Sequence, residues 1–214
     1  SIPFSDGYSA IEARAPEGTT QLTVTNTTYE SGTFDNEAGI WFKGNYSGNN
    51  ERAKSAIIHK NIGDYGVGGL HFCVDNGYDN QNASYADRKM SITKDGYVTK
   101  PSNPAFRAQG NTHYPNQTGG FDPIYNNEIF DRGSNYNPSN GRFTAPVAGT
   151  YFFYYCYLVY PDNDNYWKTM GFKINGSHSY NNGFARGDRN SQNSMQVSTY
   201  LYLNENDYIQ PHVD

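Results

Sequence analysis

Apolar and polar residues alternate along much of the chain, a pattern typical of β-strands that bury one face. Four short runs, each bounded by turn-forming residues, are predicted to be strands: residues 21–28, 39–47, 52–61 and 68–77. The last run places Leu70, Phe72 and Val74 on one face. His71 and Cys73 lie on the other face. No segment keeps helical spacing for three turns, so the sequence predicts an all-β fold.

A hairpin is predicted where Asp95-Gly96 stands between two β-forming runs, in residues 90–100. Asp-Gly is a strong hairpin signal because a type I′ turn needs positive φ at both central residues. Pro101 and Pro104 follow, and each lacks a backbone donor and restricts the residue before it, which favours an extended linker. We therefore predict two domains: a small β-rich, stalk-like unit over residues 1–100 and a second β unit over residues 101–214.

The longest apolar run, residues 151–160, is apolar or aromatic on both faces of the predicted strand. A sandwich of two sheets covers only one face of a strand, so the other face is buried by another chain, by a long loop or by the neighbouring unit. Because burial contributes roughly 25 cal/mol per Å² of apolar surface, we expect an oligomer. We predict that this strand forms the core and the subunit contact through Tyr151, Phe153, Tyr155 and Tyr157.

Composition and charge narrow the choice of partners. The 214 residues include 16 Lys and Arg against 21 Asp and Glu, and no basic cluster, so no nucleic-acid partner is expected. The apolar run has ten residues, where a membrane-spanning helix needs about 20, so no membrane insertion is expected. Cys73 and Cys156 are interpreted as small buried apolar residues, with a disulfide as the alternative.

Residues 125–155 carry aromatic, Gly and Asp residues at a spacing that resembles the C1q globular-head family, a relative of the tumour-necrosis-factor jelly roll. Tyr125 stands where the family usually has Phe. The positions that meet the family's spacing are Asp131, Tyr136, Phe143, Gly149, Tyr151, Phe153 and Tyr155. Residues 104–108 resemble the family's opening strand and residues 199–213 its penultimate stretch. The resemblance implies an antiparallel jelly-roll sandwich that assembles as a homotrimer. It also implies a closing strand after Asp214, which we expect to be absent from this chain or provided by a neighbour.

The N-terminal half resembles bacteriophage tail-fibre proteins, in which a similar hairpin precedes a C-terminal module; residues 56–61, 68–77 and 87–104 carry this resemblance. It implies an extracellular, structural virion appendage whose partners are other virion tail proteins and a host-surface glycan or protein. Three copies would present the same loops, so that weak contacts add. One alternative is a secreted cellular C1q-domain protein that binds sugars like a lectin. Another is an enzyme that degrades surface polysaccharide.

Two segments are candidate binding sites. The first combines aromatic planes with fixed acceptors, which suits stacking and hydrogen bonding to a sugar, although the rings could instead pack under the loop. Its residues are Tyr160, Asp162, Asp164, Tyr166 and Trp167. The second is an integrin-type adhesion tripeptide, expected in a loop, whose meaning depends on display to animal cells: Arg186, Gly187 and Asp188.

No motif for catalysis or metal binding is found. The sequence has no GxSxG motif and no phosphate-binding loop, so we expect a protein that is not an enzyme and has no cofactor. Its five His show no HxH or HExxH spacing, so no metal site is expected. Asp162 and Asp164 resemble the start of a calcium loop, but Trp167 and Lys173 stand where an EF-hand needs Gly and Glu. Calcium near the trimer axis, which family members sometimes hold, is the remaining alternative.

Overall fold

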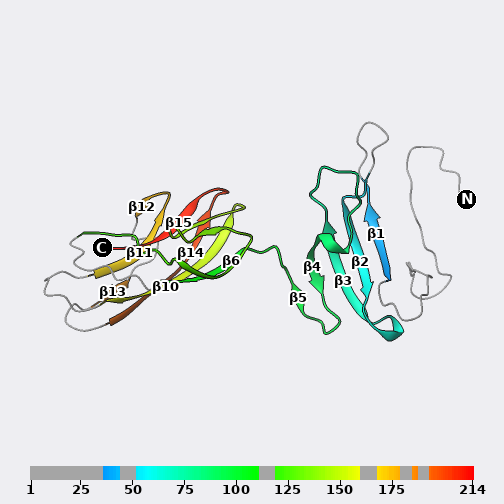
Figure 1. The fold of residues 1–214 in the computed structure, drawn as a ribbon, viewed down its shortest axis with the longest axis horizontal. Helices are drawn as coiled ribbons and strands as arrows, with labels where there is room; N and C mark the ends of the chain where they lie inside the picture. Colours follow the sequence, from blue (N-terminus) through cyan, green and yellow to red (C-terminus); the bar gives the residue numbers. More distant parts are fainter. Residues whose placement is uncertain (1–35, 44–51, 111–118, 160–167, 179–184, 188–192) are drawn as a thin grey trace, which may run out of the picture. The chain divides into compact units, whose positions relative to one another are not determined.

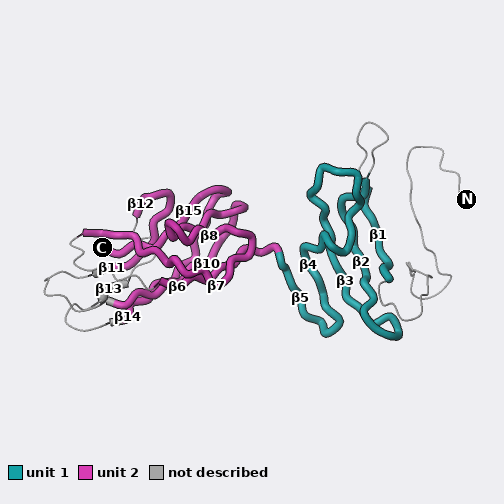
Figure 2. The backbone as a smooth tube through the Cα atoms, viewed as in Figure 1, with its two compact units in different colours: residues 1–101 teal, residues 102–214 magenta. Residues whose placement is uncertain are grey.

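A computed structural model describes residues 36–43, 52–110, 119–159, 168–178, 185–187 and 193–214. These residues form antiparallel β-sheets with two short 3₁₀ turns, so the all-β prediction is confirmed (Figure 1). Two compact units lie within residues 1–101 and 102–214, and the division falls inside the predicted proline-containing linker (Figure 2). Among the described residues no helix is long and apolar enough to cross a membrane. The predicted strand at residues 21–28 lies outside the described residues.

The first unit is a five-stranded antiparallel sheet in which each strand pairs with the next along the chain. Alternating side chains and tight turns favour this simple order, because neighbouring strands need only short connections. The strands are β1 (Glu37–Phe42), β2 (Ser55–Asn61), β3 (Gly68–Val74), β4 (Arg88–Ile92) and β5 (Val98–Thr99). The two 3₁₀ turns are η1 (Asp64–Gly66) and η2 (Tyr85–Asp87).

The two faces of this sheet differ in what covers them. One face is covered by the segment between β3 and β4, where the Trp41 indole donates to the Ala83 carbonyl over 2.9 Å. The predicted alternation in β3 is confirmed, and the buried side is the one that carries His71 and Cys73. The opposite face remains apolar and solvent-exposed in the single chain, through Ile40, Phe42, Leu70, Val74 and Val98.

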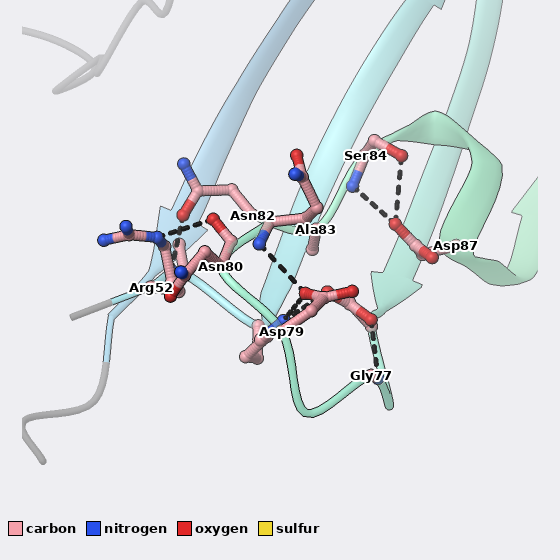
Figure 3. Close-up of polar contacts among 12 residues, drawn as sticks. Arg52, Gly77, Asp79, Asn80, Asn82, Ala83, Ser84 and Asp87 are labelled. Carbon is pink, nitrogen blue, oxygen red and sulfur yellow. Dashed lines mark hydrogen bonds and ion pairs between the residues drawn. The ribbon is translucent and has the colours of Figure 1, made fainter. Parts of the chain in front are cut away.

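The covering segment is held by polar contacts rather than by a large core (Figure 3). Arg52 donates to the Asn80 carbonyl over 2.6 Å, and the Asn82 side chain accepts from the Ala53 amide over 2.9 Å. Ser84 and Asp87 form a capping box around η2. These contacts close the small unit over its buried face.

The turn between β4 and β5 differs from the predicted type I′ turn. The hairpin itself forms, since Ser91 pairs with Thr99. Gly96 has φ of 83°, whereas Asp95 is a described residue that does not have positive φ. The Gly96 amide donates to the Thr93 carbonyl over 2.9 Å, which fits a type I turn followed by a left-handed glycine. The type I′ prediction was wrong because only the glycine, not the aspartate, bears the left-handed conformation.

We expect Gly96→Ala to lower the free energy of unfolding by roughly 1–2 kcal/mol, the cost of a left-handed conformation for a residue with a Cβ. A Cβ at this position meets nothing within 4 Å, so the cost is conformational and not steric. Gly63→Ala is the matched control, because Gly63 is extended and its added Cβ would make ordinary contacts. Urea unfolding of the full chain measures both variants, and equal stabilities would contradict the prediction.

The second unit contains ten described strands in three antiparallel sheets. One sheet pairs β6 with β7, a second pairs β10 with β14, and the third has the order β12-β11-β15-β9-β8 with β13 also paired to β11. The strands are β6 (Ala105–Gln109), β7 (Asn127–Arg132), β8 (Tyr136–Asn137), β9 (Arg142–Thr144), β10 (Gly149–Val159), β11 (Lys168–Ile174), β12 (Ser177–His178), β13 (Ala185–Gly187), β14 (Asn193–Leu203) and β15 (Tyr208–Val213). Non-sequential neighbours such as β9 and β15 are the crossovers expected of a jelly roll.

The core of the second unit is aromatic. Phe143 is 2% exposed and its ring lies 5.2 Å from Phe106 and 5.5 Å from both Tyr151 and Phe153, measured between ring centres. These rings come from three different strands, so their packing holds the sheets together. The expected opening strand and the expected return after β14 are both present, as β6 and β15.

Candidate functional site in the second unit

The inner face of β10 joins the sheets of the sandwich. Phe153 and Tyr155 are buried, and Tyr151 and Tyr157 are half-buried. The Tyr155 hydroxyl lies 2.9 Å from the Gly171 carbonyl and 2.6 Å from the His212 carbonyl, which it reaches across the core. Burial raises the pKa of this hydroxyl, so it stays neutral and acts as a donor. The four predicted residues therefore line the interior of the unit.

The outer face of β10 and β14 is the exposed aromatic surface, and we call it the aromatic face. Phe152 is 57% exposed, Tyr200 73% and Tyr202 65%. Phe152 lies directly opposite Tyr200, with ring centres 5.0 Å apart. Tyr154 and Leu158 extend the face along β10. Exposed aromatic side chains gathered on one face of a sheet are a type of surface that proteins use to contact other molecules.

Cys156 also lies on this side of β10 and is exposed, so its interpretation as a buried residue was wrong for the single chain. Cys73 is buried, as predicted, and both thiols are free. The error arose because alternate residues of a strand point to opposite faces, and neighbouring Tyr155 takes the inner one. The alternative of a disulfide between Cys73 and Cys156 is excluded in this structure.

A groove of about 850 Å³ lies between β6 and β10 and is lined by residues of both strands. Phe106, Ala108, Phe130 and Leu158 are among its apolar walls. Among the described strands β6 pairs only with β7 and β10 only with β14, so each presents an unpaired edge. At one point the Tyr125 hydroxyl donates to the Cys156 carbonyl of β10 over 2.6 Å. The closing strand expected from the family resemblance stays a prediction.

Of the candidate binding residues, the structure describes only Arg186 and Gly187. The sugar-binding candidates Tyr160, Asp162, Asp164, Tyr166 and Trp167 lie outside the described residues, as does Asp188. Arg186 and Gly187 lie on β13, opposite Thr169 and Lys168 of β11. The expectation that the adhesion tripeptide lies in a loop was therefore wrong for these two residues, because their backbone pairs in a sheet.

Sequence reasoning missed a polar cluster on the outer side of the β11–β15 sheet. Asp122 accepts hydrogen bonds from the side chains of Lys173 and Gln210, and lies 2.6 Å from His212 Nδ1. Burial alone would raise the pKa of Asp122, but the hydrogen bonds from Lys173 and His212 outweigh it and lower the pKa. Gln210 and His212 alternate along β15 and Asp214 follows directly after it, and that period-2 polar pattern was the available signal.

The antiparallel sheets and their crossovers define a jelly-roll β-sandwich protein. A family model described as "C1q domain" matches residues 105–212. The chain therefore belongs to the C1q-domain family, and the jelly-roll prediction is confirmed. A comparison with curated proteins gave no match.

Proposed function

We propose that this protein is a structural segment of a virion appendage, such as a bacteriophage tail fibre, that forms a homotrimer and attaches to a host surface through its C1q domain. The observation that carries the proposal is the aromatic face of β10 and β14, which a single chain leaves in solvent. Association of subunits removes such a face from water, and the threefold number follows from the family. Repeated copies of one weak binding site then give strong attachment.

The virion assignment is supported by the first unit. Its β4–β5 hairpin carries the Met-Ser-Ile and Asp-Gly-Tyr-Val pattern of residues 90–98 that resembles phage appendage proteins. The apolar outer face of the same sheet supports contacts with further chains, which in this proposal are other copies and other tail proteins. The proposed role is mechanical and adhesive, not enzymatic, and its location is extracellular, on the virion.

Mass spectrometry of purified virions from the source of this gene tests the assignment. We expect peptides of the chain in particles at a constant ratio to known tail proteins. Detection only in the culture fluid of uninfected cells would contradict the virion proposal and favour the secreted, lectin-like alternative. Release of reducing sugar from host polysaccharide by the purified chain would instead favour the enzyme.

The predicted sugar-binding loop has its own test. We expect Tyr166→Ala combined with Trp167→Ala to weaken attachment of the purified protein to host cells by at least tenfold, because packing of a sugar face on these rings is lost and avidity multiplies the loss. Light scattering should show an unchanged mass. Tyr78→Ala, at an exposed tyrosine of the first unit, is the matched control. Unchanged attachment of the double variant would dismiss this loop and leave the trimer proposal standing.

A further inference from the structure

Two histidines and an aspartate converge at the polar side of the β11–β15 sheet. The possible ligand atoms of His178, His212 and Asp214 all lie within 4.8 Å of one another. His212 Nε2 is 2.9 Å from Asp214 Oδ1, and His178 Nδ1 is 3.4 Å from Asp214 Oδ2. The two imidazole ring centres are 4.8 Å apart. Two nitrogens and a carboxylate in this arrangement are a ligand set that zinc uses.

Local sequence explains why these side chains meet. Asn175 and Gly176 both have positive φ, so they form the type I′ turn that folds β12 back onto β11. This pairing places His178 opposite Lys173 on β11. His212 lies opposite Gly171, which has no side chain, so the two imidazoles can meet above β11.

The third ligand is held by the backbone of the sheet. The Asp214 amide donates to the Thr169 carbonyl, and the Thr169 amide donates to the Asp214 carbonyl, each over 2.9 Å. Gly120 leaves the space beside this carboxylate, since a Cβ there would stand 2.5 Å from Asp214 Oδ1 and 2.9 Å from the His212 ring. The backbone of Asp214 is therefore fixed by strand pairing, and a side chain at position 120 would displace the carboxylate or the His212 ring.

The contacts of His212 place a carboxylate beside each of its ring nitrogens. Its Nδ1 is 2.6 Å from Asp122 Oδ1 and its Nε2 is 2.9 Å from Asp214 Oδ1, so both nitrogens face carboxylates. A neutral imidazole has a single N–H and satisfies only one of them, so the other carboxylate needs a second proton or a metal ion on the ring. With the proton on Nδ1, held by Asp122, the Nε2 lone pair faces the Asp214 carboxylate. A metal ion between Nε2 and the Asp214 carboxylate replaces the repulsion of their lone pairs with two coordinate bonds. Asp122, which contacts Nδ1, then fixes the orientation of the His212 ring.

We propose that His178, His212 and Asp214 bind one Zn²⁺ ion, with water in the fourth position. Ligand atoms of a tetrahedral zinc site lie about 3.4 Å apart, so small rotations of the two more exposed ligands, His178 and Asp214, close the site. The nitrogen ligands favour zinc over calcium, which prefers oxygen alone. The bound ion joins the β12 hairpin to β15 and stabilises that end of the sheet.

Metal content and affinity of the full chain test the proposal. After chelator treatment, the protein is dialysed against Zn²⁺, its zinc is measured by plasma mass spectrometry, and its affinity by competition with a chromophoric chelator. We expect one zinc per chain. His178→Gln and Asp214→Asn are each expected to weaken binding by about 100-fold or more, and Asp122→Asn by roughly 10–100-fold, as for an outer-shell partner. His59→Gln and Asp95→Asn, changes of the same kind in the first unit, should leave affinity unchanged.

A second readout does not depend on the zinc count. Zinc at about 100 times its dissociation constant should raise the Tm of the second unit by roughly 10 °C, and the His178→Gln variant should lose this shift. Cobalt in the same site should give the intense visible bands of a four-coordinate ion. Zinc well below one per chain, equal affinity in the ligand variants and the controls, or preferential binding of Ca²⁺ would each overturn the proposal.

Discussion

Replacing Phe152 and Tyr200 together by lysine is expected to convert the proposed trimer into monomers. These two rings face each other across β10 and β14 on the exposed side of the sheet, with centres 5.0 Å apart. In the proposed trimer they are buried, and two lysines would place unpaired charges inside the interface, where an unpaired buried charge costs several kcal/mol. Light scattering after size-exclusion chromatography measures the mass directly. We expect a threefold drop.

The control for this prediction is Tyr65→Lys combined with Tyr78→Lys. Both tyrosines are fully exposed and belong to the first unit, whereas the aromatic face belongs to the second. This variant should remain trimeric. Because the two lysines on β10 and β14 replace side chains that are exposed in the single chain, the circular dichroism of the monomeric variant should stay that of a β protein. A double lysine variant that still ran as a trimer would place the subunit contact elsewhere.

Phe143→Ala is expected to lower the free energy of unfolding of the second unit by about 3–5 kcal/mol, the range measured for loss of a buried aromatic side chain. Phe143 is 2% exposed and packs against rings from β6 and β10, so truncation opens a cavity where the sheets meet. Val147→Ala is the matched control, since Val147 is 58% exposed in the same unit. It should change stability by less than about 0.5 kcal/mol.

Denaturant titration followed by tryptophan and tyrosine fluorescence measures both variants. Phe143→Leu should lie between them, because leucine fills part of the cavity. A loss below about 1 kcal/mol for Phe143→Ala would mean that the surrounding rings collapse into the space. In that case the stacked rings, and not this side chain, would be the main link between the sheets.

Local sequence pattern was sufficient to predict the structure where a single short-range rule determines it. Alternation predicted β2 and β3, and it separated His71 and Cys73 from Leu70 and Val74 correctly. Alternation could not predict which of the two faces is covered, because the covering segment is held in place by long-range contacts such as that of Trp41 with Ala83. The same limit explains Cys156, whose side of β10 faces solvent in a single chain.

The turn at Asp95-Gly96 and the histidine cluster were missed for different reasons. In the turn, two hairpin types share the same dipeptide, and only the backbone φ of Gly96 and its neighbour distinguishes them. In the cluster, His178 and His212 belong to strands separated by β11, so the spacing of residues within one segment does not show that they lie close together. A search for ligand spacing within one segment does not detect ligands that the sheet brings together.

The sequence by itself determined the all-β class, most strand positions, the proline linker and membership of the C1q-domain family, because period-2 alternation, turn residues and aromatic spacing are local properties of the chain. Only the tertiary structure decided which face of β10 forms the core, where the groove lies, and that His178, His212 and Asp214 lie close together. These features depend on which distant strands pair. Pairing is set by the packing of whole sheets, and no single segment encodes it.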